Sequence, residues 1–250
     1  NEQRVLASKI SLRLGKEKID IISKLCLDEV LAVRISGWES KFELNSEQID
    51  VMILEGFNSN DKEIRKITIN KITEMDEINV DIIISALNDQ SYSVRNAALE
   101  IIRKDSKLSR MNIFDNHLLN IASENTKKEI NTVIKILAKK SLENPKIEQM
   151  VILWSESESI EIIDSLISTL REINWWKIKG LTEHMEKKSS DLFVTRLLRG
   201  SREPLATEIR NKILSKSERN EDMMARLIED LVGRPIDEKT LKIIKEISIS

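Results

Sequence analysis

Apolar residues recur along the chain with the spacing of one face of an α-helix. The clearest case is the stretch 87–104, where positions 0, 3, 4, 7 and 8 of one run are apolar and share a stripe: Val94, Ala97, Ala98, Ile101 and Ile102. The polar segment 88–91 precedes this run, and another apolar run ends at Leu87. The stretch therefore predicts the end of one helix, a tight turn, and a second helix that begins near Ser91.

The same stripe returns at intervals of 30 to 36 residues. With Val94 as the reference, it starts at seven positions: Val33, Ile64, Val94, Ile130, Ile160, Val194 and Met224. The first three are each followed by an arginine: Arg34, Arg65 and Arg95. The full spacing is kept from Ile130 (Val133, Ile134, Leu137, Ala138) and from Met224 (Leu227, Ile228, Leu231, Val232). From Ile160 and Val194 it is less complete. The period indicates a repeat architecture.

Each of these helices is preceded by a second amphipathic helix, such as those predicted over 49–57 and 147–154. Polar turns at 58–61, 88–91 and 155–159 separate the partners, and their Asn, Asp and Ser side chains can cap the helix that follows. Pro204 is placed to open a helix, while Gly233 and Pro235 mark the end of one. A two-helix unit of this size buries its stripe only by stacking on its neighbours. We therefore expect an all-α protein, a single α-solenoid domain over 1–250.

The composition supports a helical protein and favours a cytoplasmic location. Apolar residues make up 40% and charged residues 33%, with only 6 Gly, 3 Pro and 4% aromatics, too few turn residues and aromatics for an all-β protein. The single cysteine, Cys26, excludes an internal disulfide framework and is expected to be a buried structural thiol. No apolar run approaches the ~20 residues that cross a bilayer, and the first residues show no signal-peptide pattern. We expect a cytoplasmic protein without a membrane partner.

The stretch 87–104 resembles a HEAT repeat, in particular the short, PBS-lyase-type units of about 30 residues in the armadillo-like superfamily. The matching residues are a turn acid, a Val–Arg pair and two small residues: Asp89, Val94–Arg95 and Ala97–Ala98. Weaker copies are Asp28 with Val33–Arg34, and Asp61 with Ile64–Arg65. The resemblance covers about 15–104 with regular repeats, and is only periodic over about 105–250. It implies a right-handed superhelix of about seven two-helix repeats, with a ladder of turn acids and helix arginines between neighbours.

The sequence offers little for catalysis, a cofactor or a metal. Of the two histidines, we expect His117 to be partly buried on an apolar stripe and His184 to be solvated. The metal-dependent hydroxylases among HEAT-like proteins use repeated His-Glu pairs, and no His-Glu dipeptide occurs here. Scattered glycines exclude a phosphate loop, and no nucleophile-elbow motif is present. Glu156, Glu158 and Glu161 fit a solvated charge run. We predict no catalytic, cofactor-binding or metal-binding residue, and a protein that is not an enzyme.

Two features point instead to binding. Trp175 and Trp176 are adjacent, so on a helix they point about 100° apart, and we expect Trp176 to be at least partly exposed as an interface anchor. The segment 171–219 carries 12 Lys/Arg against 7 Asp/Glu. If second helices line a concave face, six basic residues could converge there: Lys135, Lys139, Arg196, Arg199, Arg202 and Arg226.

The favoured hypothesis is a non-enzymatic scaffold that binds a partner protein or peptide on its concave surface, with no cofactor. The alternative is a nucleic-acid-binding protein, similar to HEAT-like DNA glycosylases, that uses a basic groove in its C-terminal half. Charge favours the first hypothesis. Residues 1–125 hold 17 Lys/Arg against 21 Asp/Glu, and 126–250 hold 23 against 21, so neither half has the basic excess typical of non-specific nucleic-acid binding.

Overall fold

The computed structural model describes residues 2–11, 13, 18–44, 49–75, 77–124, 127–187, 190–216 and 220–249. Over these ranges the chain forms helices and no strand, which confirms the prediction of an all-α protein. None of the described helices is long and apolar enough to cross a membrane. The chain divides into two compact units: unit 1, Asn1–Leu118, and unit 2, Leu119–Ser250.

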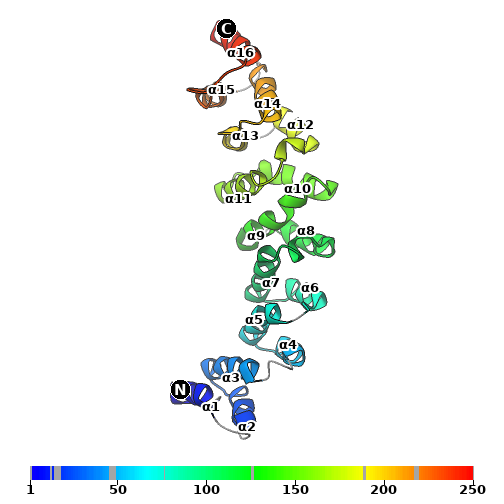
Figure 1. The fold of residues 1–250 in the computed structure, drawn as a ribbon, viewed down its shortest axis with the longest axis vertical. Helices are drawn as coiled ribbons and strands as arrows, with labels where there is room; N and C mark the ends of the chain where they lie inside the picture. The colour runs from blue at the N-terminus through cyan, green and yellow to red at the C-terminus, as the bar shows by residue number, and fades with distance from the viewer. Residues whose placement is uncertain are drawn as a thin grey trace. The chain divides into compact units, whose positions relative to one another are not determined.

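Unit 1 is built from helices in two rows (Figure 1). In the odd-numbered row each helix packs against the next one: α1 (Glu2–Ser11), α3 (Leu31–Leu44), α5 (Lys62–Lys71) and α7 (Tyr92–Lys104). Each even-numbered helix packs on the odd-numbered helix that follows it: α2 (Lys18–Leu25), α4 (Ile49–Phe57) and α6 (Val80–Leu87). Short 3-10 segments follow α5 and α7: η2 (Ile72–Glu74), η3 (Leu108–Arg110) and η4 (Asn112–Phe114).

The core of unit 1 is made by the stripes that the periodicity predicts. All five stripe residues of α7 are buried, and the second alanine, Ala98, is fully buried. On α3 the equivalent position, three residues after the arginine, is Gly37. A Cβ atom there would lie 2.8 Å from the backbone of Leu25 and Cys26, at the end of α2. Small residues at this position therefore allow the two rows to approach closely.

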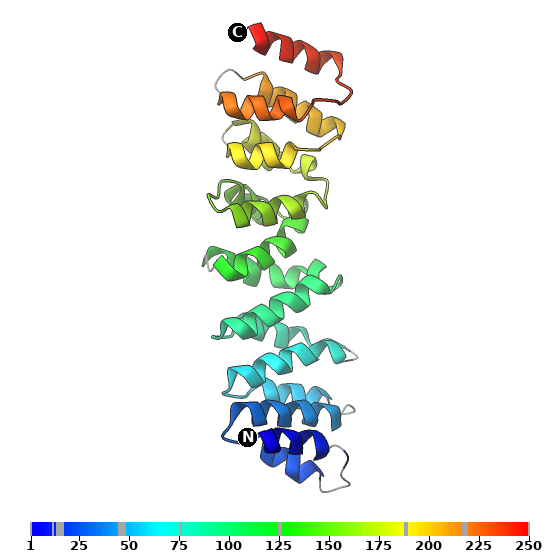
Figure 2. The ribbon, with the colours of Figure 1, turned by 90° about the vertical axis from the view of Figure 1, so that its left-hand side faces the viewer.

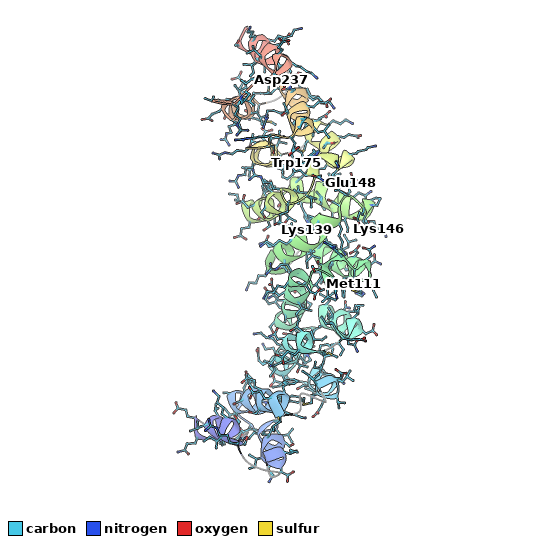
Figure 3. All side chains as sticks on the ribbon, in the orientation of Figure 1. Met111, Lys139, Lys146, Glu148, Trp175 and Asp237 are labelled. Atoms are coloured by element: carbon cyan, nitrogen blue, oxygen red, sulfur yellow. The ribbon has the colours of Figure 1, made fainter. Side chains whose placement is uncertain are left out.

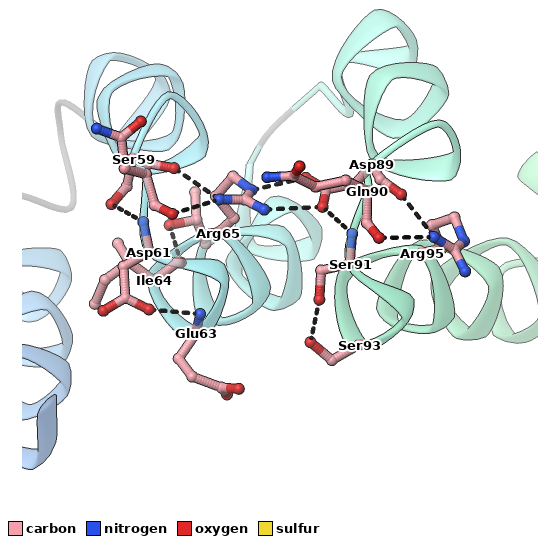
Figure 4. Close-up of polar contacts among 12 residues, drawn as sticks. Ser59, Asp61, Glu63, Ile64, Arg65, Asp89, Gln90, Ser91, Ser93 and Arg95 are labelled. Carbon is pink, nitrogen blue, oxygen red and sulfur yellow. Dashed lines mark hydrogen bonds and ion pairs between the residues drawn. The ribbon is translucent and has the colours of Figure 1, made fainter.

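A ladder of arginines and aspartates connects successive helices of the odd-numbered row, and Figure 4 shows its rung between Arg65 and Asp89. Arg65 of α5 donates from Nε and Nη2 to the Asp89 carboxylate, at 2.7 and 2.9 Å. Arg34 of α3 donates from Nη2 to Asp61 at 2.7 Å, and Arg4 of α1 donates to Asp28 at 2.8 Å. The ladder that the HEAT resemblance implies is thus present in unit 1, with an additional rung at Arg4 that the sequence analysis missed.

Arginines of the odd-numbered row also fix the turns in front of their own helices. Arg65 Nη1 donates to the backbone carbonyls of Ser59 and Asn60, at 2.9 and 3.1 Å. Arg95 Nη1 repeats this arrangement, donating to the carbonyls of Asp89 and Gln90 at 2.8 and 3.2 Å (Figure 4). Each of these arginines therefore satisfies turn carbonyls that would otherwise lack partners.

Hydrogen bonds also set the titration of two ladder acids. Burial by itself would raise the pKa of Asp89, but the hydrogen bonds from Arg65 and from the Ser91 amide outweigh it and lower this pKa below its usual range. Asp61 has a lowered pKa for the same combination of reasons, with Arg34 as the main donor. Asp61 also caps α5, since its carboxylate accepts from the Glu63 amide at 2.9 Å. Ser91 and Ser159 precede helices without a side-chain capping bond, so capping by these two serines was wrongly expected.

Unit 2 has the same two-row arrangement, seen from a second side in Figure 2. Its odd-numbered row consists of α9 (Lys127–Leu137), α11 (Ile160–Leu170), α13 (Asp191–Leu198) and α15 (Glu221–Glu229). Its even-numbered row consists of α10 (Pro145–Ser155), α12 (Lys179–Lys187), α14 (Pro204–Leu214) and α16 (Glu238–Ile249). The division between the units falls within α8 (Asp115–Ser123), and two 3-10 segments complete unit 2: η5 (Ala138–Lys140) and η6 (Trp175–Lys177).

Two predicted stripes of unit 2 are partly wrong. Ile160 is 55% exposed because α11 begins at this residue, and burial starts one turn later at Ile163. On α15 the fully buried position is Met223 rather than Met224. Val232, predicted on the same stripe, is 78% exposed because α15 ends at Glu229. Beyond the end of a helix the helical period no longer decides burial: Leu231 is buried, as predicted, and Val232 is exposed.

Of the predicted signals at helix ends in unit 2, Pro204 is confirmed, whereas α15 ends at Glu229, four residues before Gly233. Pro204 is the first residue of α14, where its missing amide hydrogen costs no hydrogen bond. Gly233 has a φ angle of +75° and Gly200 one of +80°, in the left-handed region that glycine adopts readily. These two glycines follow α15 and α13, and both turns lie beside the candidate site described next.

Candidate functional site: the arginine cleft

A cleft of 780 Å³ opens in unit 2 between α13 and α15, neighbours in the odd-numbered row (Figure 1). Its walls combine arginines, two acids and a few apolar side chains: Leu192, Thr195, Arg196, Arg199, Gly200, Arg226, Glu229, Asp230, Val232 and Arg234. Four of its residues are arginines, and we call it the arginine cleft.

Two of the four arginines are held by acids. Arg196 of α13 forms an ion pair with Asp164 of α11. Arg234, in the segment after α15, donates to Asp230 at 2.8 Å. Asp230 also accepts from Arg210 of α14 at 3.1 Å, so its charge is shared between two guanidinium groups. These pairs are structural contacts between neighbouring elements and leave little charge available for a ligand.

The other two arginines have no such partner. Among the described residues, nothing forms an ion pair or hydrogen bond with the guanidinium groups of Arg199 and Arg226. Both side chains belong to exposed residues. Arg199 comes from the end of α13 and Arg226 from the middle of α15, so each wall contributes one available cation. Glu229 is the remaining acid on these walls. The cleft therefore offers two guanidinium groups to an anion.

The turn that carries Arg199 is fixed from two sides. Arg171, just after α11, donates from Nη2 to the backbone carbonyls of Arg196 and Arg199, at 2.6 and 3.0 Å. These carbonyls lie at the C-terminal end of α13, where helix carbonyls lack partners and carry partial negative charge. On the other side, the amide of Gly200 donates to Asp230 at 3.2 Å. The backbone next to Arg199 is therefore held in place before any ligand binds.

A buried arginine, Arg210, contacts the end of α13 next to the cleft. Arg210 is 1% exposed, and its Nη2 donates to the carbonyl of Leu198 at 2.7 Å. Burial lowers the pKa of Arg210, and the neighbouring Asp230 opposes that change. Arg234 also lines a second hollow of 350 Å³, and Arg202 is another of its lining residues.

The structure brings together only some of the predicted binding residues. Arg196, Arg199 and Arg226 line the arginine cleft, and Arg202 lines the adjoining hollow. Lys135 and Lys139 line neither of them. Lys135 is exposed, and Lys139 forms an ion pair with Glu172 at 2.7 Å. Arg234 and the supporting Arg171 were not among the predicted binding residues.

The tryptophan pair behaves as its spacing predicts, although it lies in η6 rather than on an α-helix. Trp175 is 1% exposed and points into the interior of unit 2 (Figure 3), whereas Trp176 is partly exposed. Their rings meet edge to face with centroids 5.8 Å apart. Trp176 does not line the arginine cleft. Its role as an interface anchor stays a prediction.

The residues considered for chemistry have structural surroundings. Cys26 is buried as expected, and burial raises the pKa of its thiol to about 11. His117 is partly buried, with Nδ1 3.3 Å from the Asn88 amide. The expectation that His184 is solvated was wrong: its side chain is 17% exposed and Nε2 lies 2.9 Å from Glu156. Within the ranges that the structure describes, no group of three or more His, Cys, Asp or Glu side chains is placed to hold a metal ion.

The comparisons with known proteins add no relative. No protein-family model matches this chain, and a search of curated proteins found no match either.

Proposed function

We propose that the chain is a HEAT-like α-solenoid that acts as a non-enzymatic scaffold, holding an acidic segment of a partner protein in the arginine cleft. The two-row packing and the arginine–aspartate ladder of unit 1 support the HEAT-like assignment. The proposed architecture has about seven two-helix repeats in a right-handed superhelix, with the odd-numbered helices on the concave side. Such a stack is suited to binding extended partners along one face.

A single observation carries the proposed binding site. Arg199 and Arg226 stand on opposite walls of a cleft, and neither guanidinium group has a partner among the described residues. Arginine is enriched at binding hot spots, and its planar donors match carboxylates well. Partner contacts would therefore concentrate on these two residues, with Trp176 as a predicted contact outside the cleft.

Binding of a fluorophore-labelled, glutamate-rich peptide tests this function. Fluorescence anisotropy should show saturable binding, and Arg199→Glu with Arg226→Glu should weaken it by about tenfold or more, because like charges then face the peptide. Lys135→Glu with Lys146→Glu is the matched control. This pair makes the same total charge change at two exposed residues that lie outside the cleft. Equal losses in both variants would refute the placement of the site.

The arginines also favour a second candidate, a nucleic-acid-binding groove, since guanidinium groups bind phosphates. The modest excess of two basic residues over 126–250 counts against it. A salt titration with a single-stranded oligonucleotide separates the two functions. A nucleic-acid groove would bind tightly at low ionic strength and lose affinity steeply as salt increases.

A further inference from the structure

The charge in the arginine cleft is concentrated rather than spread along a groove. Arg196 and Arg234 are already paired with Asp164 and Asp230, so the available charge is that of Arg199 and Arg226. Glu229 also lines the cleft and adds a negative charge that disfavours a large number of phosphates there. A compact group with two negative charges fits this distribution better than a long polyanion.

The chemistry of the donors points in the same direction. A phosphate monoester carries a charge of about −1.5 to −2 at neutral pH and has three strong acceptor oxygens. Two guanidinium groups from opposite walls can each donate two hydrogen bonds to one such group. A carboxylate carries one charge and two oxygens, so it can satisfy only one guanidinium group fully.

The apolar residues of the cleft indicate what carries the phosphate. Leu192 and the 78% exposed Val232 line the same cleft as the two arginines. They provide contacts for an apolar side chain, which a peptide has and a sugar-phosphate backbone lacks. A volume of 780 Å³ lies in the range of sites that enclose small ligands or a few residues of peptide.

We propose that the arginine cleft binds a phosphorylated serine or threonine in a partner segment, with Arg199 and Arg226 holding the phosphate and Leu192 and Val232 contacting a neighbouring apolar side chain. This inference rests on the proposed function and narrows it. The scaffold would then recognise only phosphorylated partners, so partner binding would depend on a modification of the partner.

The test uses one short peptide library in three forms, with phosphoserine, serine or glutamate at a fixed central position and random flanks. We expect the phosphoserine form to bind the full chain about tenfold or more tightly than either other form. Binding should weaken as the pH falls below about 6, because the phosphate then loses its second charge. Flanking positions should select apolar residues.

Matched variants identify the residues. Arg199→Gln with Arg226→Gln should remove the preference for phosphoserine, whereas Lys135→Gln should leave it unchanged. Arg199→Lys keeps the positive charge but loses the paired donors of the guanidinium group. We expect this variant to keep only part of the preference for phosphoserine. Thermal unfolding of each variant shows whether it is folded, which is expected because both arginines belong to exposed residues.

Three outcomes would overturn the inference in different ways. If the glutamate form binds as tightly as the phosphoserine form and depends on Arg199 and Arg226, the cleft is a general acidic-peptide site and only the phosphate inference fails. If no form binds, or if binding is insensitive to both arginines, the inference fails together with the proposed site. A single-stranded oligonucleotide that outcompetes the phosphoserine library would assign the cleft to nucleic acid instead.

Discussion

Arg65 and Asp89 form the most buried rung of the ladder in unit 1. Two hydrogen bonds, at 2.7 and 2.9 Å, join the guanidinium group of one helix to the carboxylate in the turn before the next. Only 9% of the Arg65 side chain and 7% of the Asp89 side chain are exposed. By comparison, the side chains of Arg34 and Asp61 are 27% and 23% exposed. The ladder is therefore most buried at its last rung, between α5 and the turn before α7.

Removal of the buried rung should destabilise unit 1 substantially. We expect Arg65→Ala to lower the free energy of unfolding by about 3 kcal/mol, because it leaves the Asp89 carboxylate buried without its partner. Arg34→Ala should cost about 1 kcal/mol, since solvent reaches both of its charges. Urea denaturation followed by circular dichroism measures both variants. Equal losses of unfolding free energy in the two variants would mean that burial of an ion pair does not determine how much it stabilises unit 1.

The same rung predicts a pH dependence. The pKa of Asp89 is lowered in the folded protein, so its contribution to stability is fully present above about pH 4, the usual aspartate pKa of the unfolded chain. That contribution is lost as the pH falls through the lower folded pKa. The stability difference between wild type and Asp89→Asn should therefore shrink as the pH falls from about 4 to about 2. A difference that stays constant over this interval would contradict the assignment.

Gly37 offers a test of helix packing in which two effects have opposite signs. Helix propensity alone predicts that Gly37→Ala stabilises the protein by about 1 kcal/mol. The close backbone of Leu25 and Cys26 predicts a loss of about 1 to 3 kcal/mol through overpacking. We expect the loss, measured by chemical denaturation. Gly180→Ala is the matched control and should cost less, because the atom nearest to its Cβ is a carboxylate oxygen of Glu148, at the end of a flexible side chain.

Cys26 should report on the opening of unit 1. It is buried, and burial raises its pKa to about 11, so at neutral pH the thiol is protonated as well as shielded. We expect a thiol-specific reagent to react slowly with the folded protein and rapidly in denaturant. Full reaction of the native protein at the rate of a free cysteine would show that this part of unit 1 is open.

The sequence predicts the helices well because their burial follows a local period. The stripe that begins at Val94 is buried throughout, and so is the one that begins at Ile130. Two errors lie at helix ends: Ile160 is the first residue of α11, and Val232 lies beyond the end of α15. A third lies within α15, where Met223 rather than Met224 is buried. Burial at helix ends depends on where a cap or a glycine ends the helix.

The cleft is harder to predict than the helices. The basic bias indicates Arg196, Arg199 and Arg226, yet their convergence depends on the stacking of α13 against α15, which lie about one repeat apart. Arg234 lies outside any helix and carries no periodic signal. Which arginines are already paired also depends on tertiary contacts, such as the one between Arg196 and Asp164. The sequence therefore indicates the cations but cannot separate structural ones from available ones.

The central claim is that Arg199 and Arg226 are the residues that hold a ligand anion. Nuclear magnetic resonance of the arginine Nε–Hε groups tests this most directly, with the phosphoserine peptide library as the added probe. The account predicts that the Arg199 and Arg226 signals shift and saturate together, while those of the paired Arg65 and Arg34 in unit 1 stay unchanged. Shifts spread evenly over all arginines, or absent from these two, would contradict it.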